Sequence, residues 1–299
     1  QRTYRPTQVR RDQGGDSPEV RQFLPIALPG RCVCKPGDMR IALTGSSGKL
    51  GSVVLHELRA AGHEVIGMDV VGDRAPGFVR VDLTDYGQVI DALTGVNDQH
   101  DGFDAVVHLA AIPAPGLVPD VATFHNNMPS TFNVFWAAIR LGITRIVYAS
   151  SETVLGLPFD VPPPYIPVDE EYAARPESVY SLVKHLEEQL AIELVRWNPD
   201  VSITALRFSN VMVPEDYEAF PYDADPRDRK WNLWGYIDAR DGAQAIQRAL
   251  EVAPAGFDRF IIAAADTVTT IPNAELAAAA FPELPVHGAL GEPTTMLYI

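Results

Sequence analysis

Cysteine is almost missing from this chain of 299 residues, and the two that occur, Cys32 and Cys34, stand two apart near the amino-terminal end. A disulfide framework is therefore excluded, and the composition is typical of a reducing compartment, so we expect a cytoplasmic protein. The seven histidines show neither H-x-x-x-H nor H-E-x-x-H spacing. Because helical zinc ligands need such spacing, we predict no metal site.

Long apolar runs and an excess of positive charge are also lacking. No run approaches the roughly 20 residues of a membrane-spanning helix, and two prolines interrupt the apolar stretch 23–30. The formal net charge is −15, which makes a nucleic-acid backbone an unfavourable partner. We therefore expect neither a membrane nor a nucleic acid as the partner.

Residues 1–38 are polar, contain five prolines and show no sustained period. We expect them to be a non-native or disordered extension, with the folded domain starting at Met39. Residues 39–299 are expected to form one domain with a small C-terminal substrate lobe. The expected lobe segments are residues 157–176, 209–236 and 265–299. The chain ends as though a further strand began there, which predicts additional C-terminal residues.

From Met39 on, short apolar runs alternate with amphipathic helical patterns. The runs that predict strands are 40–45, 63–69, 78–85, 103–111, 144–151, 201–208 and 258–264. The helical patterns are 49–62, 86–95, 120–141, 177–197, 238–252 and 272–281. Strands that are apolar on both faces and separated by helices predict an α/β fold, with a doubly wound, Rossmann-like parallel sheet.

A glycine-rich stretch, TGSSGKLG, connects the first predicted strand to the first helix. Backbone amides converge at such a turn, and the helix dipole favours an anion, so we predict a dinucleotide pyrophosphate there. A nucleoside-triphosphatase loop is excluded, because it needs four residues before its Gly-Lys pair and a hydroxyl after it. The predicted phosphate-binding residues are Gly45, Ser47, Gly48, Lys49, Leu50 and Gly51.

Acidic residues lie near the ends of the next two predicted strands. Asp69 ends the second strand, 18 residues after Gly51. A carboxylate there accepts both ribose hydroxyls of an adenosine and repels a 2′-phosphate, so we predict NAD rather than NADP. Asp82 and Leu83 lie near the end of the third predicted strand, where we expect them to bond the adenine amine and cover its ring.

Tyr180 and Lys184 stand four residues apart on one face of a predicted helix, and Ser151 ends a strand about 30 residues earlier. Oxidation of a secondary alcohol needs a base, but the pKa of tyrosine is about 10. A neighbouring ammonium and a positively charged nicotinamide ring would lower that pKa. We therefore predict Tyr180 as the base, Lys184 as its activator and Ser151 as the group that holds the reacting oxygen, a role that Thr153 would share.

The order of these motifs resembles the extended short-chain dehydrogenase/reductases, the NAD-dependent epimerase/dehydratase family. The resemblance covers about residues 39–281 and rests on TGSSGKLG, MDVVG, VDLTD, VVHLAA, HNNMPSTFNVFWAA, RIVYASSETVLG, YSLVK, LRFSNV and YIDARDGA. It implies that Lys184 also bonds the nicotinamide ribose and that Asn127 organises the site. It further implies that Ala110 and Ala111 lie along the cofactor.

The resemblance also bears on helix geometry and assembly. Helices 120–141 and 177–197 would pair with their copies in a homodimer, as in relatives. Pro129 within the first of these helices removes one backbone hydrogen bond, which predicts a local kink close to Asn127.

The substrate implied by the resemblance is a sugar-like small molecule. Ser151-x-Thr153 resembles the 4-epimerase branch, whereas the dehydratase branch carries an Asp-Glu pair in place of Glu152-Thr153, so dehydration is disfavoured. Asn210 and Arg229 are predicted substrate contacts, the arginine for a carboxylate or phosphate. Three functions stay open: an epimerase of a sugar or nucleotide-sugar, an NAD dehydrogenase of a uronate or another small substrate, or a catalytically idle dinucleotide-binding sensor.

Overall fold

The computed structural model describes residues 38–73, 75–95, 100, 102–287 and 294–298. The expected extension of residues 1–38 lies outside the described residues except for Asp38. None of the helices in the described part of the chain combines the length and the apolar character that a membrane crossing requires.

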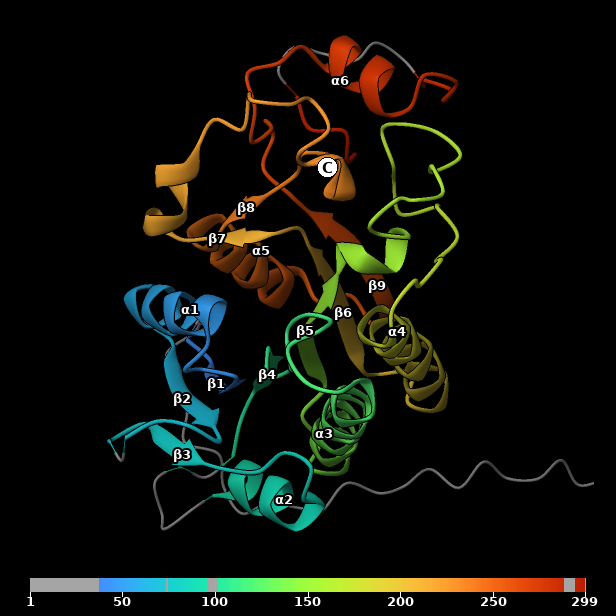
Figure 1. The fold of residues 1–299 in the computed structure, drawn as a ribbon. Helices are drawn as coiled ribbons and strands as arrows, with labels where there is room; N and C mark the ends of the chain where they lie inside the picture. Colours follow the sequence, from blue (N-terminus) through green and yellow to red (C-terminus); the bar gives the residue numbers. More distant parts are fainter. Residues whose placement is uncertain (1–37, 74, 96–99, 101, 288–293, 299) are drawn as a thin grey trace, which may run out of the picture.

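Seven parallel strands form the central sheet in the order β3-β2-β1-β4-β5-β6-β9 (Figure 1). The strands are β1 Arg40–Thr44, β2 Glu64–Asp69, β3 Phe78–Arg80, β4 Ala105–His108, β5 Arg145–Ser151, β6 Ser202–Phe208 and β9 Gly256–Ile262. The chain builds outward from β1 to β3 and then crosses to β4 on the other side of β1. The predicted doubly wound sheet is therefore confirmed, and its switch point lies between β1 and β4, where ligands of such sheets bind.

Helices cover both faces of the sheet. They are α1 Lys49–Ala60, α2 Tyr86–Thr94, α3 Asp120–Arg140, α4 Val179–Trp197 and α5 Ala239–Val252, while α6 Asn273–Ala280 lies away from the sheet. Figure 1 shows α1 and α5 on one face and α2, α3 and α4 on the other. In β1, Ile41 and Leu43 pack on the α1–α5 side while Ala42 packs on the other side. This alternation explains why the strands are apolar throughout.

The amino-terminal end of α4, the helix that carries Tyr180 and Lys184, is capped by side chains. Ser178 caps α4 by accepting from the backbone N–H of Ser181, whose hydroxyl accepts from the backbone N–H of Ser178. This capping box fixes the start of α4, whose first two turns present Tyr180 and Lys184. α3 runs through Pro129 as one helix.

A second hydrophobic cluster lies beyond the carboxyl ends of the strands. It draws residues from all three expected lobe segments, with Trp234, Phe159 and Met296 almost fully buried. Short strands β7 Val211–Met212 and β8 Ile237–Asp238 pair in this region, and α6 lies over it (Figure 1). Backbone bonds of Val168 with Met296 and Tyr298 join distant parts of the chain here.

Candidate active site

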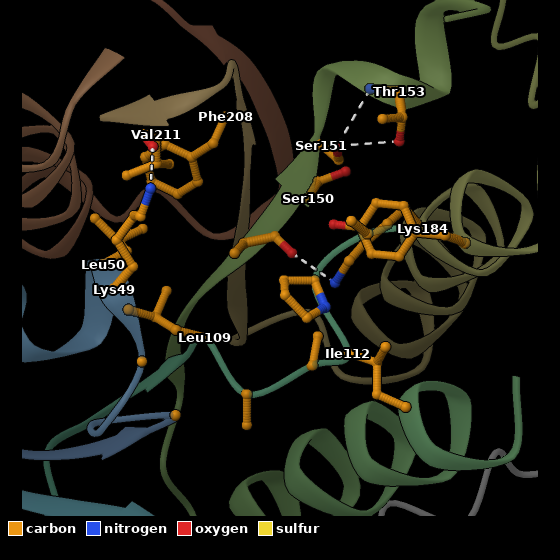
Figure 2. Close-up of a pocket in the computed structure, with 18 of the residues that line it drawn as sticks. Lys49, Leu50, Leu109, Ile112, Ser150, Ser151, Thr153, Lys184, Phe208 and Val211 are labelled. Carbon is orange, nitrogen blue, oxygen red and sulfur yellow. Dashed lines mark hydrogen bonds between the residues drawn. The ribbon is translucent and has the colours of Figure 1, made fainter. Parts of the chain in front are cut away.

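A cavity of about 1070 Å³ lies at the carboxyl ends of the strands, beside the segments that follow β1 and β4. It reaches the upper end of the range of small-molecule pockets, roughly 300–1,000 Å³. Figure 2 shows Lys49 and Leu50 on one side of it and Ser151, Thr153 and Lys184 on the other. The cavity therefore joins the glycine loop to the residues predicted to carry the chemistry.

Most predicted site residues lie in the wall of this cavity. They are Gly45, Ser47, Gly48, Lys49, Leu50, Gly51, Asp69, Asp82, Leu83, Ala110, Ala111, Ser151, Thr153, Tyr180, Lys184 and Asn210. Because these residues come from seven separate segments of the chain, their meeting follows from the parallel order of the strands.

The glycine loop has the geometry of a cradle for backbone contact. Gly45 has φ +70°, and a Cβ there would stand 2.6 Å from the backbone nitrogen of Ala110. A Cβ on Gly51 would stand 2.0 Å from the carbonyl oxygen of Gly45. α1 starts at Lys49 without any capping side chain. Its first amides are therefore open to an anion, which is what a dinucleotide pyrophosphate would supply.

Asp69 stands beside this loop at the end of β2. Its Oδ2 accepts from the backbone N–H of Ser47 at 3.0 Å, and its Oδ1 accepts from that of Val71 at 3.3 Å. Each carboxylate oxygen keeps a further lone pair. The residues present thus fit an adenosine ribose with free hydroxyls. Asp82 instead accepts from the backbone and side chain of Thr84, which leaves its outer oxygen for other contacts.

Ser151, Tyr180 and Lys184 meet at one end of the cavity. Ser151 Oγ accepts from the N–H and the hydroxyl of Thr153 at 3.2 and 3.0 Å, so its own proton is directed to the oxygen of Tyr180. Lys184 Nζ lies 6.0 Å from the centre of the Tyr180 ring and donates to the carbonyl of Ala149 at 2.8 Å (Figure 2). The three predicted residues therefore form one hydrogen-bonded and electrostatic group.

The protonation of Tyr180 differs from the expectation. Burial raises the pKa of Tyr180 above its ordinary value of 10, although the ammonium of Lys184 and the hydroxyl of Ser151 act in the opposite direction. The prediction that Lys184 lowers this pKa has the right sign for its own contribution. It omitted the desolvation of a phenol that is almost fully enclosed. The chain by itself therefore keeps Tyr180 protonated at neutral pH.

Two predicted residues do not lie in the cavity wall. Asn127 is fully buried, and its amide is used at both ends, accepting from the N–H of Ile112 at 2.8 Å and donating to its carbonyl at 3.0 Å. It therefore braces the loop after β4 rather than facing the cofactor. Its neighbours Asn126 and Ser130 line the cavity instead. Asn127 points away from the cavity that Asn126 lines, because successive residues of an α-helix are rotated by about 100°.

Arg229 lines a smaller adjoining hollow of about 450 Å³ that shares Lys49 and Asn210 with the main cavity. Its guanidinium lies over the rings of Tyr222 and Trp231, at 5.0 and 4.8 Å. Nε and Nη2 of Arg229 are buried and have no hydrogen-bond partner among the described residues.

Glu152 belongs to the cavity wall, although the sequence around it is equally compatible with an exposed residue. It is buried, and its Oε1 is 3.5 Å from Nδ2 of Asn232. Burial raises the pKa of Glu152 to about 8, which the neighbouring Ser209, Asn232 and Arg229 oppose. Glu152 is thus a neutral acid at neutral pH. No sequence signal distinguishes it from a surface glutamate, because its burial depends on the lobe.

Among the described residues, no three His, Cys, Asp or Glu side chains gather in a way that would hold a metal ion. The buried pair of Arg207 and Glu188, with Nη2–Oε2 at 2.8 Å, joins β6 to α4 behind the cavity. It supports the position of α4 and does not line the cavity.

Residues 41–262 match the sequence model of one protein family, which is described as "NAD dependent epimerase/dehydratase family". This chain belongs to that family. The family description names NAD, which confirms the predicted cofactor, whereas the preference over NADP stays a prediction.

Individual members of the epimerase/dehydratase family that resemble this chain act on different sugars. UDP-glucose 4-epimerase of Bacillus subtilis is 27% identical over 58% of this chain and 52% of the relative. L-Arabinose 1-dehydrogenase (NAD(P)⁺) of Haloferax volcanii is 33% identical over 50% of this chain and 59% of the relative. The structure of glucuronic acid dehydrogenase from Chromohalobacter salexigens superposes with a TM-score of 0.59 and 26% identity, covering 82% and 84% of the two chains. The chain spans about half the length of the curated relatives it matches.

Proposed function

We propose that this protein oxidises a secondary alcohol of a small, sugar-like substrate with NAD. The observation that carries the proposal is the meeting of Ser151, Tyr180 and Lys184 in the same cavity as the uncapped start of α1 and Asp69. A dinucleotide bound along the glycine loop would bring its reactive end towards Tyr180, because one continuous cavity joins them.

The residues of the chain divide the chemistry between them. When bound, NAD supplies the hydride acceptor and a positive charge close to Tyr180. With a substrate in the cavity, Ser151 would turn its hydroxyl proton from the Tyr180 oxygen to the reacting oxygen, while Thr153 fixes the orientation of Ser151. Tyr180 takes the proton of the alcohol, and Lys184 stabilises the phenolate that performs this step. Lys184 also has a third N–H donor for the cofactor ribose, since its Nζ makes two hydrogen bonds to the protein.

The charges of the adjoining hollow favour a small substrate over a nucleotide-sugar. Three carboxylates, those of Glu215, Asp216 and Glu218, line it, and Asp216 pairs with Lys49 at 2.9 Å. A diphosphate placed there would meet these carboxylates with little free positive charge. A single carboxylate could instead pair with Arg229 if its guanidinium turned towards the hollow, because Nε and Nη2 are enclosed and have no partner in the part of the chain that the structure describes. The sugar dehydrogenases among the similar proteins support this choice, and 4-epimerisation is the second candidate.

The assembly and the cofactor preference belong to the same proposal. We expect a homodimer in which α3 and α4 pair with their copies, since both helices expose apolar side chains such as Phe132 and Leu182. We expect NAD rather than NADP, because Asp69 would meet the 2′-phosphate.

The test starts with the purified protein and asks whether it retains NAD. An empty protein that reduces added NAD with a free uronate or aldose supports the proposal. Protein that retains NAD and interconverts UDP-glucose and UDP-galactose supports epimerisation instead. Protein that binds NAD and turns over none of these substrates indicates a sensor and contradicts the proposal. Tyr180→Phe serves as the control for contaminating activity.

A further inference from the structure

A row of buried polar side chains lies behind Lys184 and takes no part in the mechanism above. Lys184 Nζ contacts Oε2 of Glu187 at 2.9 Å, and Oε1 of Glu187 contacts the hydroxyl of Thr131 at 2.8 Å. The same hydroxyl lies 3.1 Å from Nε2 of His108, and Nδ1 of His108 lies 2.7 Å from Oγ1 of Thr44. These five side chains are all almost fully buried. They connect α4, α3, β4 and β1.

The direction of each hydrogen bond in this row follows from its acceptors. A carboxylate only accepts, so Lys184 and Thr131 both donate to Glu187. Thr131 has then used its one proton, and His108 must donate to it from Nε2. Burial lowers the pKa of His108 to about 3, so its ring is neutral and carries no second proton. Nδ1 of His108 therefore accepts from the hydroxyl of Thr44.

The far end of the row reaches the cofactor side of the sheet. Oγ1 of Thr44 lies 3.4 Å from the backbone nitrogen of Ala110, which stands against the first glycine of the loop. Every bond from Ala110 to Glu187 thus donates towards the carboxylate, and Lys184 donates to it from the other side. Burial raises the pKa of Glu187, and the ammonium of Lys184 and the hydroxyl of Thr131 oppose this by stabilising the carboxylate. The same ion pair holds the ammonium of Lys184 in place.

We propose that Glu187 is a positioning residue, which fixes the Lys184 ammonium next to Tyr180 and ties it through Thr131 and His108 to the strand ends that carry the glycine loop. This inference rests on the proposed function, because it assigns Lys184 the activation of Tyr180. The negative charge of Glu187 also offsets part of the field of Lys184. Tyr180 therefore keeps its proton until a further positive charge, such as that of the cofactor, enters the cavity.

The other charged groups around Tyr180 and Lys184 do not replace this role. On α4, Glu188 is held by Arg207 of β6 at 2.8 Å and by Ser150 at 2.7 Å. From β5, Tyr148 is a buried phenol whose pKa burial raises well above 10. Arg259 of β9 acts on the Tyr148 and Glu188 side. Directly after β5, burial keeps Glu152 neutral at neutral pH. Glu187 is the carboxylate that forms an ion pair with Lys184.

The experiment measures the ionisation of Tyr180 directly and needs no substrate. The tyrosinate absorbance of Tyr180 is the difference between two proteins titrated with alkali, one with Tyr180 and one with Tyr180→Phe. This pair is prepared in the natural background and with Glu187→Gln. Glu193→Gln, an exposed carboxylate on the same helix, is the matched control. Loss of the Glu187 charge should move the midpoint to lower pH, while Glu193→Gln leaves it unchanged.

Activity supplies the second readout, with NAD and the sugar that the natural protein oxidises. Glu187→Gln should lower kcat by about tenfold, since Lys184 loses one of its two fixed contacts. It should move the acid limb of the pH profile to lower pH, because the ammonium stays on the Ala149 carbonyl without the opposing carboxylate. An unchanged titration midpoint in folded Glu187→Gln overturns the inference even if the natural protein is active. A natural protein without turnover contradicts the proposed function, while the titration still decides the role of Glu187.

A measurement on the natural protein covers the case in which Glu187→Gln does not fold. Nitrogen NMR of the histidine ring should show His108 neutral, with its proton on Nε2, from mildly acidic to alkaline pH. A proton on Nδ1, or a charged ring near neutral pH, would reverse the direction of the row and overturn the inference. Thr131→Val removes one donor to Glu187 at nearly constant volume. In this variant the proton of His108 should no longer be confined to Nε2.

Discussion

Tyr180 shows how the surroundings of a single side chain decide its chemistry. Burial keeps its proton on, while Lys184 and Ser151 favour the phenolate. The balance means that the oxidation step depends on alkaline pH or on the arrival of positive charge. The rate of alcohol oxidation should therefore rise with pH, because the base form of Tyr180 increases as pH approaches its raised pKa.

We expect Tyr180→Phe to lower kcat for oxidation by about 10²–10⁴ while NAD still binds, because the proton acceptor is lost and the cofactor wall stays intact. Steady-state kinetics and calorimetric titration with NAD measure the two effects. The pH dependence of any remaining rate should be flat. A variant that keeps both its activity and the alkaline rise would show that another group is the base.

Glu152 should make stability depend on pH. Its folded pKa of about 8 lies above the ordinary value of 4.5, so the folded protein binds the extra proton between these two values. Stability therefore falls as pH rises through this window and levels off above it. Glu152→Gln should raise Tm at alkaline pH and have a much smaller effect at mildly acidic pH.

Thermal unfolding at several pH values measures this difference between Glu152→Gln and the natural protein. Glu193→Gln, an exposed substitution, should show the same Tm difference at every pH. A Glu152→Gln effect that is equal at acidic and alkaline pH would mean that Glu152 is ionised in the folded protein.

At the scale of elements, the turn from β1 into α1 distinguishes two kinds of glycine. Gly51 meets the carbonyl of Gly45 and leaves no room for a Cβ, whereas a Cβ on Gly48 would stand 3.3 Å from the same carbonyl. Gly48 also has φ −76°, which any residue adopts. Gly51 therefore allows the helix to pack against the turn, whereas Gly48 allows a ligand to approach the backbone.

Two alanine substitutions should separate these roles. Gly51→Ala should lower the free energy of unfolding by about 1–3 kcal/mol, because backbone must move. Gly48→Ala should change it by less than about 1 kcal/mol and weaken NAD binding by about tenfold, roughly 1.4 kcal/mol. Urea unfolding and NAD titration measure the pair. Equal losses of stability in both variants would contradict the assignment.

The elements also differ in how much of their structure could be predicted from the sequence. The strands and helices of the sheet could be predicted because apolar periodicity records local burial, and the loop, Ser151, Tyr180 and Lys184 carry spaced motifs. Asn127 faces the loop after β4 and not the cavity, because the rotation of α3 relative to the sheet is set by packing. Glu152, Glu187 and His108 gain their roles from contacts across elements, which spacing does not record. Only the i, i+3 relation of Lys184 and Glu187 hinted at a pair.

For the molecule as a whole, the cavity couples cofactor binding to stability. NAD that binds the folded protein alone should raise its stability by about 2.7 kcal/mol at a concentration of 100 times Kd. NADP at the same concentration should raise Tm less, because its 2′-phosphate meets Asp69. Differential scanning fluorimetry with both dinucleotides measures this. Asp69→Ala should reduce the difference, and equal shifts in the natural protein would contradict the cofactor preference.

The lobe closes over the sheet through contacts between segments made at very different times. Val168 bonds Met296 and Tyr298, and Trp234 packs with Phe281. During translation, β1 to β5 can pair as they leave the ribosome. The lobe that covers the substrate side can form only after these distant partners have been synthesised. A nascent chain could thus hold a dinucleotide before it has any compartment for a sugar. Cofactor supply would then act on the yield of folded protein as well as on its turnover.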